Sequence, residues 1–183
     1  MKPTRMRIAG LLGGGLALVL VATAQGATHH SDKSFEQHVL SKMHEVNQME
    51  IAMGKMAERK GQASSVRNYG REMRQAHEAS DKKVTSLAHK EGIHLVATTP
   101  MNAEERRQVE ADRRAHQDLT AAHGADFDRQ YMQAMDQGHA SVARILTQAR
   151  ANLHDGRAHA LVSQTIPVVQ HHQRMAEDVI RSL

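Results

Sequence analysis

Apolar residues recur at steps of three or four along four long stretches of the chain, 34–60, 64–91, 125–153 and 157–183. This spacing is the period of an α-helix that buries one face. A half-buried strand would need apolar residues at every second position, and no stretch shows that pattern. Pro167 predicts a kink in the last helix, because proline removes one backbone hydrogen bond. The sequence therefore predicts an all-α protein.

Capping and breaking residues mark the predicted ends of these helices. Ser34 and Gln37 form a capping-box pattern at the start of the first helix. Ser64 or Ser65 is a candidate N-cap for the second helix, and the third is expected to begin near Ala125 or Asp126. Glycines, which favour helix ends, stand at Gly61, Gly92, Gly124 and Gly156.

The second and third long helices are joined by a long connection. Residues 93–99 are expected to be extended or irregular, since Pro100 disfavours helix before it. Asn102 and Glu105 predict the capped start of a short, highly charged surface helix over 103–120. Two antiparallel hairpins joined by one long crossover have the connectivity of a ferritin-like four-helix bundle. That is the fold we predict.

The first 26 residues resemble an export signal. Three basic residues precede an uncharged apolar run over 8–21, which has 14 residues, whereas a membrane-spanning helix needs roughly 20. Small residues allow cleavage after Ala24 or Gly26. We therefore expect a periplasmic or secreted protein with no stable membrane span after cleavage. The predicted divisions are a signal peptide over 1–26, a polar lead over 27–33 and a helical bundle domain over 34–183.

The charge balance argues against a nucleic-acid partner. The chain has 24 Lys and Arg against 20 Asp and Glu. Three of the basic residues and no acidic residue precede position 25. After cleavage, 21 basic residues therefore remain against 20 acidic residues. Opposite charges are interspersed, and two Tyr and two Phe offer little stacking surface for bases. The absence of cysteine excludes disulfides and a lipoprotein anchor.

Four polar residues interrupt the apolar stripes, one in each long helix: Glu50, His77, His139 and His172. Counting from the turns places the two members of each hairpin at similar depth along the bundle axis. Side chains that converge inside a bundle form metal and cofactor sites. Three imidazoles and one carboxylate suit one transition-metal ion such as Zn, Fe, Mn, Ni or Cu. Asp136, one turn before His139, would orient that imidazole or add an acidic ligand.

A second interpretation of these residues involves no metal. A buried network of Glu and His side chains would fix the register of the helices. Buried polar groups need partners and would gather in either case, so spacing alone leaves both interpretations open. A separate copper site is expected only if cleavage follows Gly26. The new amino terminus, with His29 in third position, would then suit square-planar Cu(II).

Four stretches of the chain resemble a known family. They are Met49 to Ala57, Tyr69 to His77, Phe127 to His139, and Thr165 to His172. Over roughly 35–183 the chain resembles an exported bacterial family described as a domain of unknown function. Its members are often labelled putative membrane or outer-membrane proteins. The resemblance implies a ferritin-like fold. It also implies that family members usually have the same residue types at the positions of Glu50, His77, His139 and His172.

The chain departs from the family pattern at acidic positions. The family often has an acidic residue before each His, where this chain has Ala76, Gly138 and His171, and Ala52 replaces a second acid. A di-iron site needs more carboxylates than remain, so oxidase activity is not expected. With no nucleophile motif or phosphate loop, enzymatic function is the least favoured class. We expect a helical bundle that binds a metal ion and has a role in metal handling or envelope stress. The alternative is a structural or interaction protein of the cell envelope, in which the charged residues 104–118 face a partner.

Overall fold

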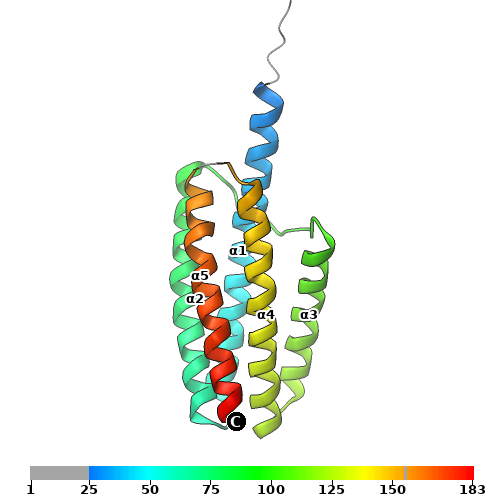
Figure 1. Ribbon diagram of the computed structural model, residues 1–183, viewed down its shortest axis with the longest axis vertical. Coiled ribbons are helices and arrows are strands. Elements are labelled where there is room, and N and C mark those ends of the chain that lie inside the picture. The colour runs from blue at the N-terminus through cyan, green and yellow to red at the C-terminus, as the bar shows by residue number, and fades with distance from the viewer. Residues whose placement is uncertain (1–24, 155) are drawn as a thin grey trace, which may run out of the picture.

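The computed structural model describes residues 25–154 and 156–183, and this part of the chain contains five α-helices and no strand. The all-α prediction is confirmed. Four long helices run side by side, and a shorter one lies at the edge against α4 (Figure 1). The helices are α1 (Gln25–Lys60), α2 (Ser64–Glu91), α3 (Ala103–Ala121), α4 (Gly124–Asn152) and α5 (Arg157–Ser182).

Two hairpins form the bundle. α1 packs along α2 and α4 along α5, while α2 contacts α5 and α1 contacts α4. The first pair approaches closely where Gly54 faces Gly70. A Cβ added at Gly54 would lie 2.6 Å from the carbonyl oxygen of Gly70. The absence of side chains at this crossing lets the two backbones meet, about two turns from the polar residues Asn47 and His77.

The predicted start of the first helix is wrong. The helix begins at Gln25 rather than at Ser34, so residues 27–33, expected to be a polar lead, have helical backbone. No proline interrupts this segment, and Ser34 and Gln37 are tolerated inside a helix. A capping-box pattern alone therefore does not fix a helix start. Residues 1–24, which hold most of the predicted signal peptide, lie outside the described residues.

The turn between α1 and α2 is held by another helix. Neither Ser64 nor Ser65 caps α2, because Ser64 is already helical and the N-cap, Ala63, makes no side-chain hydrogen bond. The buried carboxylate of Asp128, on α4, accepts hydrogen bonds from the backbone N–H groups of Gln62 (2.9 Å) and Ala63 (2.7 Å). The Asp128 carboxylate thus accepts hydrogen bonds from two backbone N–H groups of the turn and links the second hairpin to the first.

We predict that Asp128→Ala destabilises the protein by about 1–2 kcal/mol, because two N–H groups lose their acceptor at a helix N-terminus. Asp126→Ala is the matched control, since Asp126 lies half a turn away with its side chain 73% exposed. Urea denaturation measures both variants. Equal stability of the two variants would show that Asp128 does not hold the turn.

Other predicted ends are confirmed. Gly92 follows α2 in the left-handed conformation (φ 63°) and Asn102 caps α3, accepting a hydrogen bond from the Glu105 N–H (2.9 Å). Residues 93–101 have no helix or strand. α5 continues through Pro167, and the kink expected there stays a prediction. Within the described residues, no helix is long and apolar enough to span a membrane.

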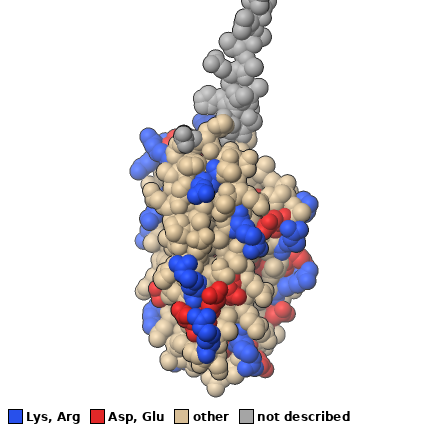
Figure 2. All heavy atoms as spheres, viewed as in Figure 1, with Lys and Arg blue, Asp and Glu red and all other residues tan. Residues whose placement is uncertain are grey.

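The short helix α3 is charged, as predicted. On its exposed side, Glu110 accepts hydrogen bonds from Arg113 (2.7 Å) and Arg114 (3.0 Å). Figure 2 shows one face of the molecule, with basic and acidic side chains intermixed. α3 packs mainly on α4.

The core consists of two apolar clusters with a polar layer between them. The upper cluster includes Leu40, Val84, Leu146 and Val162, and the lower one Met53, Met73, Phe127, Tyr131 and Ala176. Each long helix contributes residues to both clusters. Between them in sequence lies Glu50, His77, His139 or His172. Glu50, His77, His139 and His172 are all at least 94% buried. The two apolar clusters therefore hold the four helices at a level where polar side chains face inward.

Candidate metal centre

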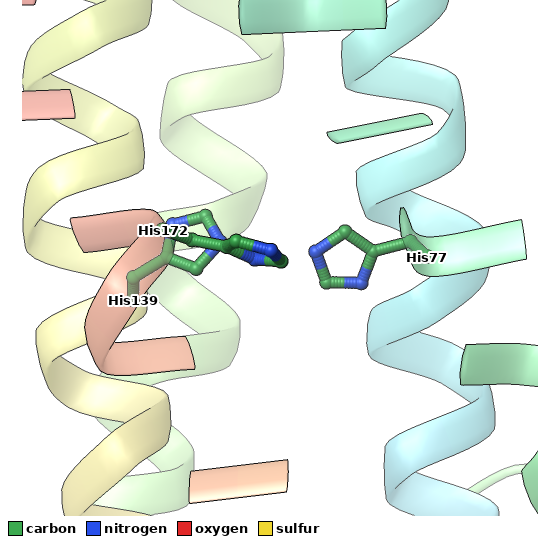
Figure 3. Close-up of side chains that lie close together, drawn as sticks. All are labelled: His77, His139 and His172. Atoms are coloured by element: carbon green, nitrogen blue, oxygen red, sulfur yellow. The ribbon is translucent and has the colours of Figure 1, made fainter. Parts of the chain in front are cut away.

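Three histidines from three helices converge in the polar layer. His77 lies on α2, His139 on α4 and His172 on α5, and the rings point toward one another (Figure 3). One ring nitrogen from each lies within 4.8 Å of the others. The ring centroids are 5.3–6.0 Å apart, and the side chains are 3–6% exposed. We call this group the His trio.

The outer ring nitrogens of two members are already hydrogen-bonded. His77 Nδ1 donates to the side-chain oxygen of Asn47 at 2.9 Å, and His139 Nδ1 donates to the carbonyl oxygen of Met135 at 2.7 Å. With the proton held on Nδ1, the Nε2 atom of each neutral ring carries a free lone pair. Both Nε2 atoms are buried without a hydrogen-bond partner, as is Nδ1 of His172.

Burial keeps the His trio neutral. It lowers the pKa of His77 to about 3 and that of His172 to about 4, and nearby imidazoles, His139 in both cases, add to the shift. The pKa of His139 is also lowered by burial, against the opposing effects of the Met135 carbonyl and Asp136. A metal binds the neutral imidazole. At neutral pH the trio is therefore in the form that ligates metals, without first losing protons.

The geometry fits a transition-metal ion after a small closure. Bonds of about 2.0–2.1 Å from Zn²⁺ to nitrogen at tetrahedral angles place two ligand nitrogens about 3.4 Å apart. One nitrogen from each member of the trio lies within 4.8 Å of the others, so each pair would have to approach by no more than about 1.4 Å to bind an ion. Three protein ligands leave one position of a tetrahedral ion open to another molecule.

Glu50 is buried in the same layer but is not part of the close group. The carboxyl is 5% exposed, and its Oε2 atom has no hydrogen-bond partner. Burial raises its pKa to about 7. Burial raises the pKa values of Tyr69, Tyr131 and Asp112, and the charge of Glu50 adds to each of these shifts. The structure thus brings together three of the four predicted ligands, and a ligand role for Glu50 stays a prediction.

Asp136 makes a different contact from the one expected. Its carboxylate accepts a hydrogen bond from Gln173 Nε2 at 3.1 Å. The hydrogen bond that orients His139 goes instead to the Met135 carbonyl, four residues earlier on the same helix. Asp136 acts on His139 only through its charge, which opposes the lowering of that pKa.

Asn47 is the site residue that the sequence analysis missed. It is 4% exposed and fixes the tautomer of His77, while its own Nδ2 atom is buried without a partner. The signal was present, because Asn47 stands one helical turn before Glu50 and one turn after Met43 on the buried face of α1. The side chains of the candidate copper site at residues 27–29 lie outside the described part of the chain.

A protein-family model described as a domain of unknown function, DUF4142, matches residues 20–179. The match covers most of the chain. This protein belongs to the DUF4142 family. Comparison with curated proteins finds no match, and neither does comparison with solved structures. The resemblance to an uncharacterised domain family is therefore confirmed, whereas the ferritin-like fold and export stay predictions. The DUF4142 description assigns no activity, so a function has to be argued from the site.

Proposed function

We propose that this DUF4142 protein binds one divalent transition-metal ion through His77, His139 and His172, and serves metal handling or envelope stress outside the cytoplasm. The observation that carries the proposal is the convergence of three neutral, buried imidazoles, each with a ring nitrogen that has no hydrogen-bond partner. Glu50 is the proposed fourth ligand or a nearby base. The identity of the ion is a matter for experiment.

The tautomers favour a cation over a network of polar side chains. A polar network needs donors as well as acceptors at its centre. His77 and His139 each have one proton, and both protons are directed outward to Asn47 and Met135. Their inward nitrogens are therefore both acceptors and do not satisfy each other. Each unsatisfied buried polar atom costs about 1–3 kcal/mol. A bound cation accepts the lone pairs of both inward nitrogens at once.

Export and the ferritin-like arrangement belong to the same proposal. Export is supported by the basic start, the apolar run and the small residues before Gly26. The ferritin-like fold is supported by two helical hairpins, α1–α2 and α4–α5, with α3 in the connection between them. We infer a signal peptide over 1–26 and a periplasmic or secreted domain beyond it.

Elemental analysis by mass spectrometry tests the proposal. The protein is purified from the periplasm without an affinity tag, beside His77→Ala and His139→Ala. His89→Ala is the matched control, since His89 is an exposed residue on the same helix as His77. We predict about one metal ion per chain in the wild type and the control, and loss of at least tenfold in both trio variants. Metal-free wild-type protein that takes up no added ion would favour the polar network.

A further inference from the structure

A cavity of about 270 Å³ adjoins the His trio. Its lining comes mainly from α1, α4 and α5, with the loop before α3 at one side. His77 and His172 both line it, and so does Asn47. Two members of the trio therefore belong both to the proposed metal site and to the wall of the cavity, although their unpartnered nitrogens are themselves buried.

Most of the surface that lines the cavity is apolar. Val39, Met43 and Leu146 are buried wall residues. Met101 (57% exposed) and Val168 (47% exposed) also line it, and they are among the few large apolar side chains that the described part of the chain exposes. Such a lining, closed by a few polar groups at one place, is typical of a site for a small molecule with an apolar body.

Asn47, Glu105 and Lys42 are among the polar residues that line the cavity, and Asn47 is the one bonded to the trio. The Nδ2 atom of Asn47 is a buried donor without a partner. The carboxylate of Glu105 is already engaged, since it accepts hydrogen bonds from His38 Nε2 (3.1 Å) and the Met101 N–H (2.8 Å). Lys42 adds a positive charge to the lining, 3.5 Å from Glu45. Lys42 and Glu105 thus both have partners, so the unpartnered donor of Asn47 is the polar feature of the lining that favours a ligand head group with acceptor atoms.

The size of the cavity limits the ligand. An engineered cavity of about 150 Å³ holds benzene, which has six heavy atoms. In proportion, about 270 Å³ holds roughly ten or eleven. A straight-chain acid with eight carbons has about this size.

We propose that the cavity binds a monocarboxylic acid with an apolar chain of about eight carbons, its carboxylate directed toward Asn47 and the metal ion beside it. The proposal rests on the metal site proposed above, in the form in which Glu50 is a nearby base and the fourth position of the ion is open. The inward nitrogens of neutral imidazoles carry lone pairs and repel a carboxylate, whereas a dication with an open position attracts it. Binding of the acid therefore requires the metal.

The test is calorimetric titration of octanoate into the zinc-loaded and the metal-free protein. We expect octanoate to bind the zinc-loaded form at least tenfold more tightly than the metal-free form. Octanoate should also bind roughly 250-fold more tightly than butanoate, since it has four more methylenes and each buried methylene is worth about fourfold in affinity. Val142→Phe places a larger side chain in the cavity and should abolish octanoate binding while zinc binding remains. Val109→Phe, on α3 and outside the cavity lining, is the control.

The outcomes separate the two proposals. Zinc binding without octanoate binding would overturn the acid site and leave the metal site standing. Equal octanoate affinity with and without zinc, or equal affinity of butanoate and octanoate, would also overturn it. Failure of the wild-type protein to bind zinc would overturn the metal site, and the acid site with it.

Discussion

One equivalent of Zn²⁺ is expected to raise the melting temperature of the metal-free protein by about 5–10 °C. A ligand that binds only the folded state adds about 2.7 kcal/mol of stability when its free concentration is 100 times its Kd. For a chain of this size, 1 kcal/mol corresponds to about 2–4 °C. The rise comes from three imidazole nitrogens that are buried without partners until the ion binds.

His77→Ala is the decisive variant for this expectation. It removes one of the three converging nitrogens and is expected to abolish the rise, whereas His89→Ala, an exposed position on the same helix, should keep it. Differential scanning calorimetry with and without zinc measures both. A rise of equal size in the two variants would show that zinc stabilises the protein from a surface site.

The second large effect is a loss of stability in acid that Glu50 partly offsets. We predict that the metal-free wild type loses about 2 kcal/mol between pH 7 and pH 5 and that Glu50→Gln loses about 4 kcal/mol. The trio has lowered pKa values, about 3 for His77 and about 4 for His172. Its stabilising contribution is complete above the unfolded pKa of about 6.5 and is lost as the pH falls, because only the unfolded chain takes up protons there.

Glu50 changes the stability with pH in the opposite direction to the His trio. Its pKa is raised by burial from 4.5 to about 7, so its contribution is complete below about pH 4.5 and is lost as the pH rises through 7. Asp112, whose pKa burial raises to about 6, acts in the same direction to a smaller extent. Urea denaturation at pH 5, 6 and 7 in the presence of a chelator measures the effect. Parallel pH profiles for the wild type and Glu50→Gln would show that the Glu50 carboxyl does not titrate as a buried group.

The sequence predicts the helices and the His trio because both follow from helical periodicity. Each histidine stands where the stripe of its own helix requires an apolar residue, so each is buried wherever the bundle forms. The sequence does not predict the partners of the inward-facing rings. Asn47 and Glu50 are three residues apart on one face of α1, and the rotation of that helix in the bundle decides which of them contacts His77.

Other features depend on tertiary contacts. In the last helix, Val168 is 47% exposed, whereas its neighbour Val169 is buried. That helix has apolar residues on adjacent faces, and the neighbouring helices select one of them. The turn between α1 and α2 is satisfied by Asp128, which is 65 residues from Ala63 in sequence. No local pattern contains that information.

The coordination of the ion is the most direct test of the central claim. X-ray absorption spectroscopy of the zinc-loaded protein is expected to show nitrogen ligands at about 2.0–2.1 Å with scattering from three imidazoles. In His77→Ala the same measurement should show fewer imidazoles or no bound zinc. A wild-type spectrum with only oxygen ligands, or one that His77→Ala leaves unchanged, would contradict a metal centre formed by His77, His139 and His172.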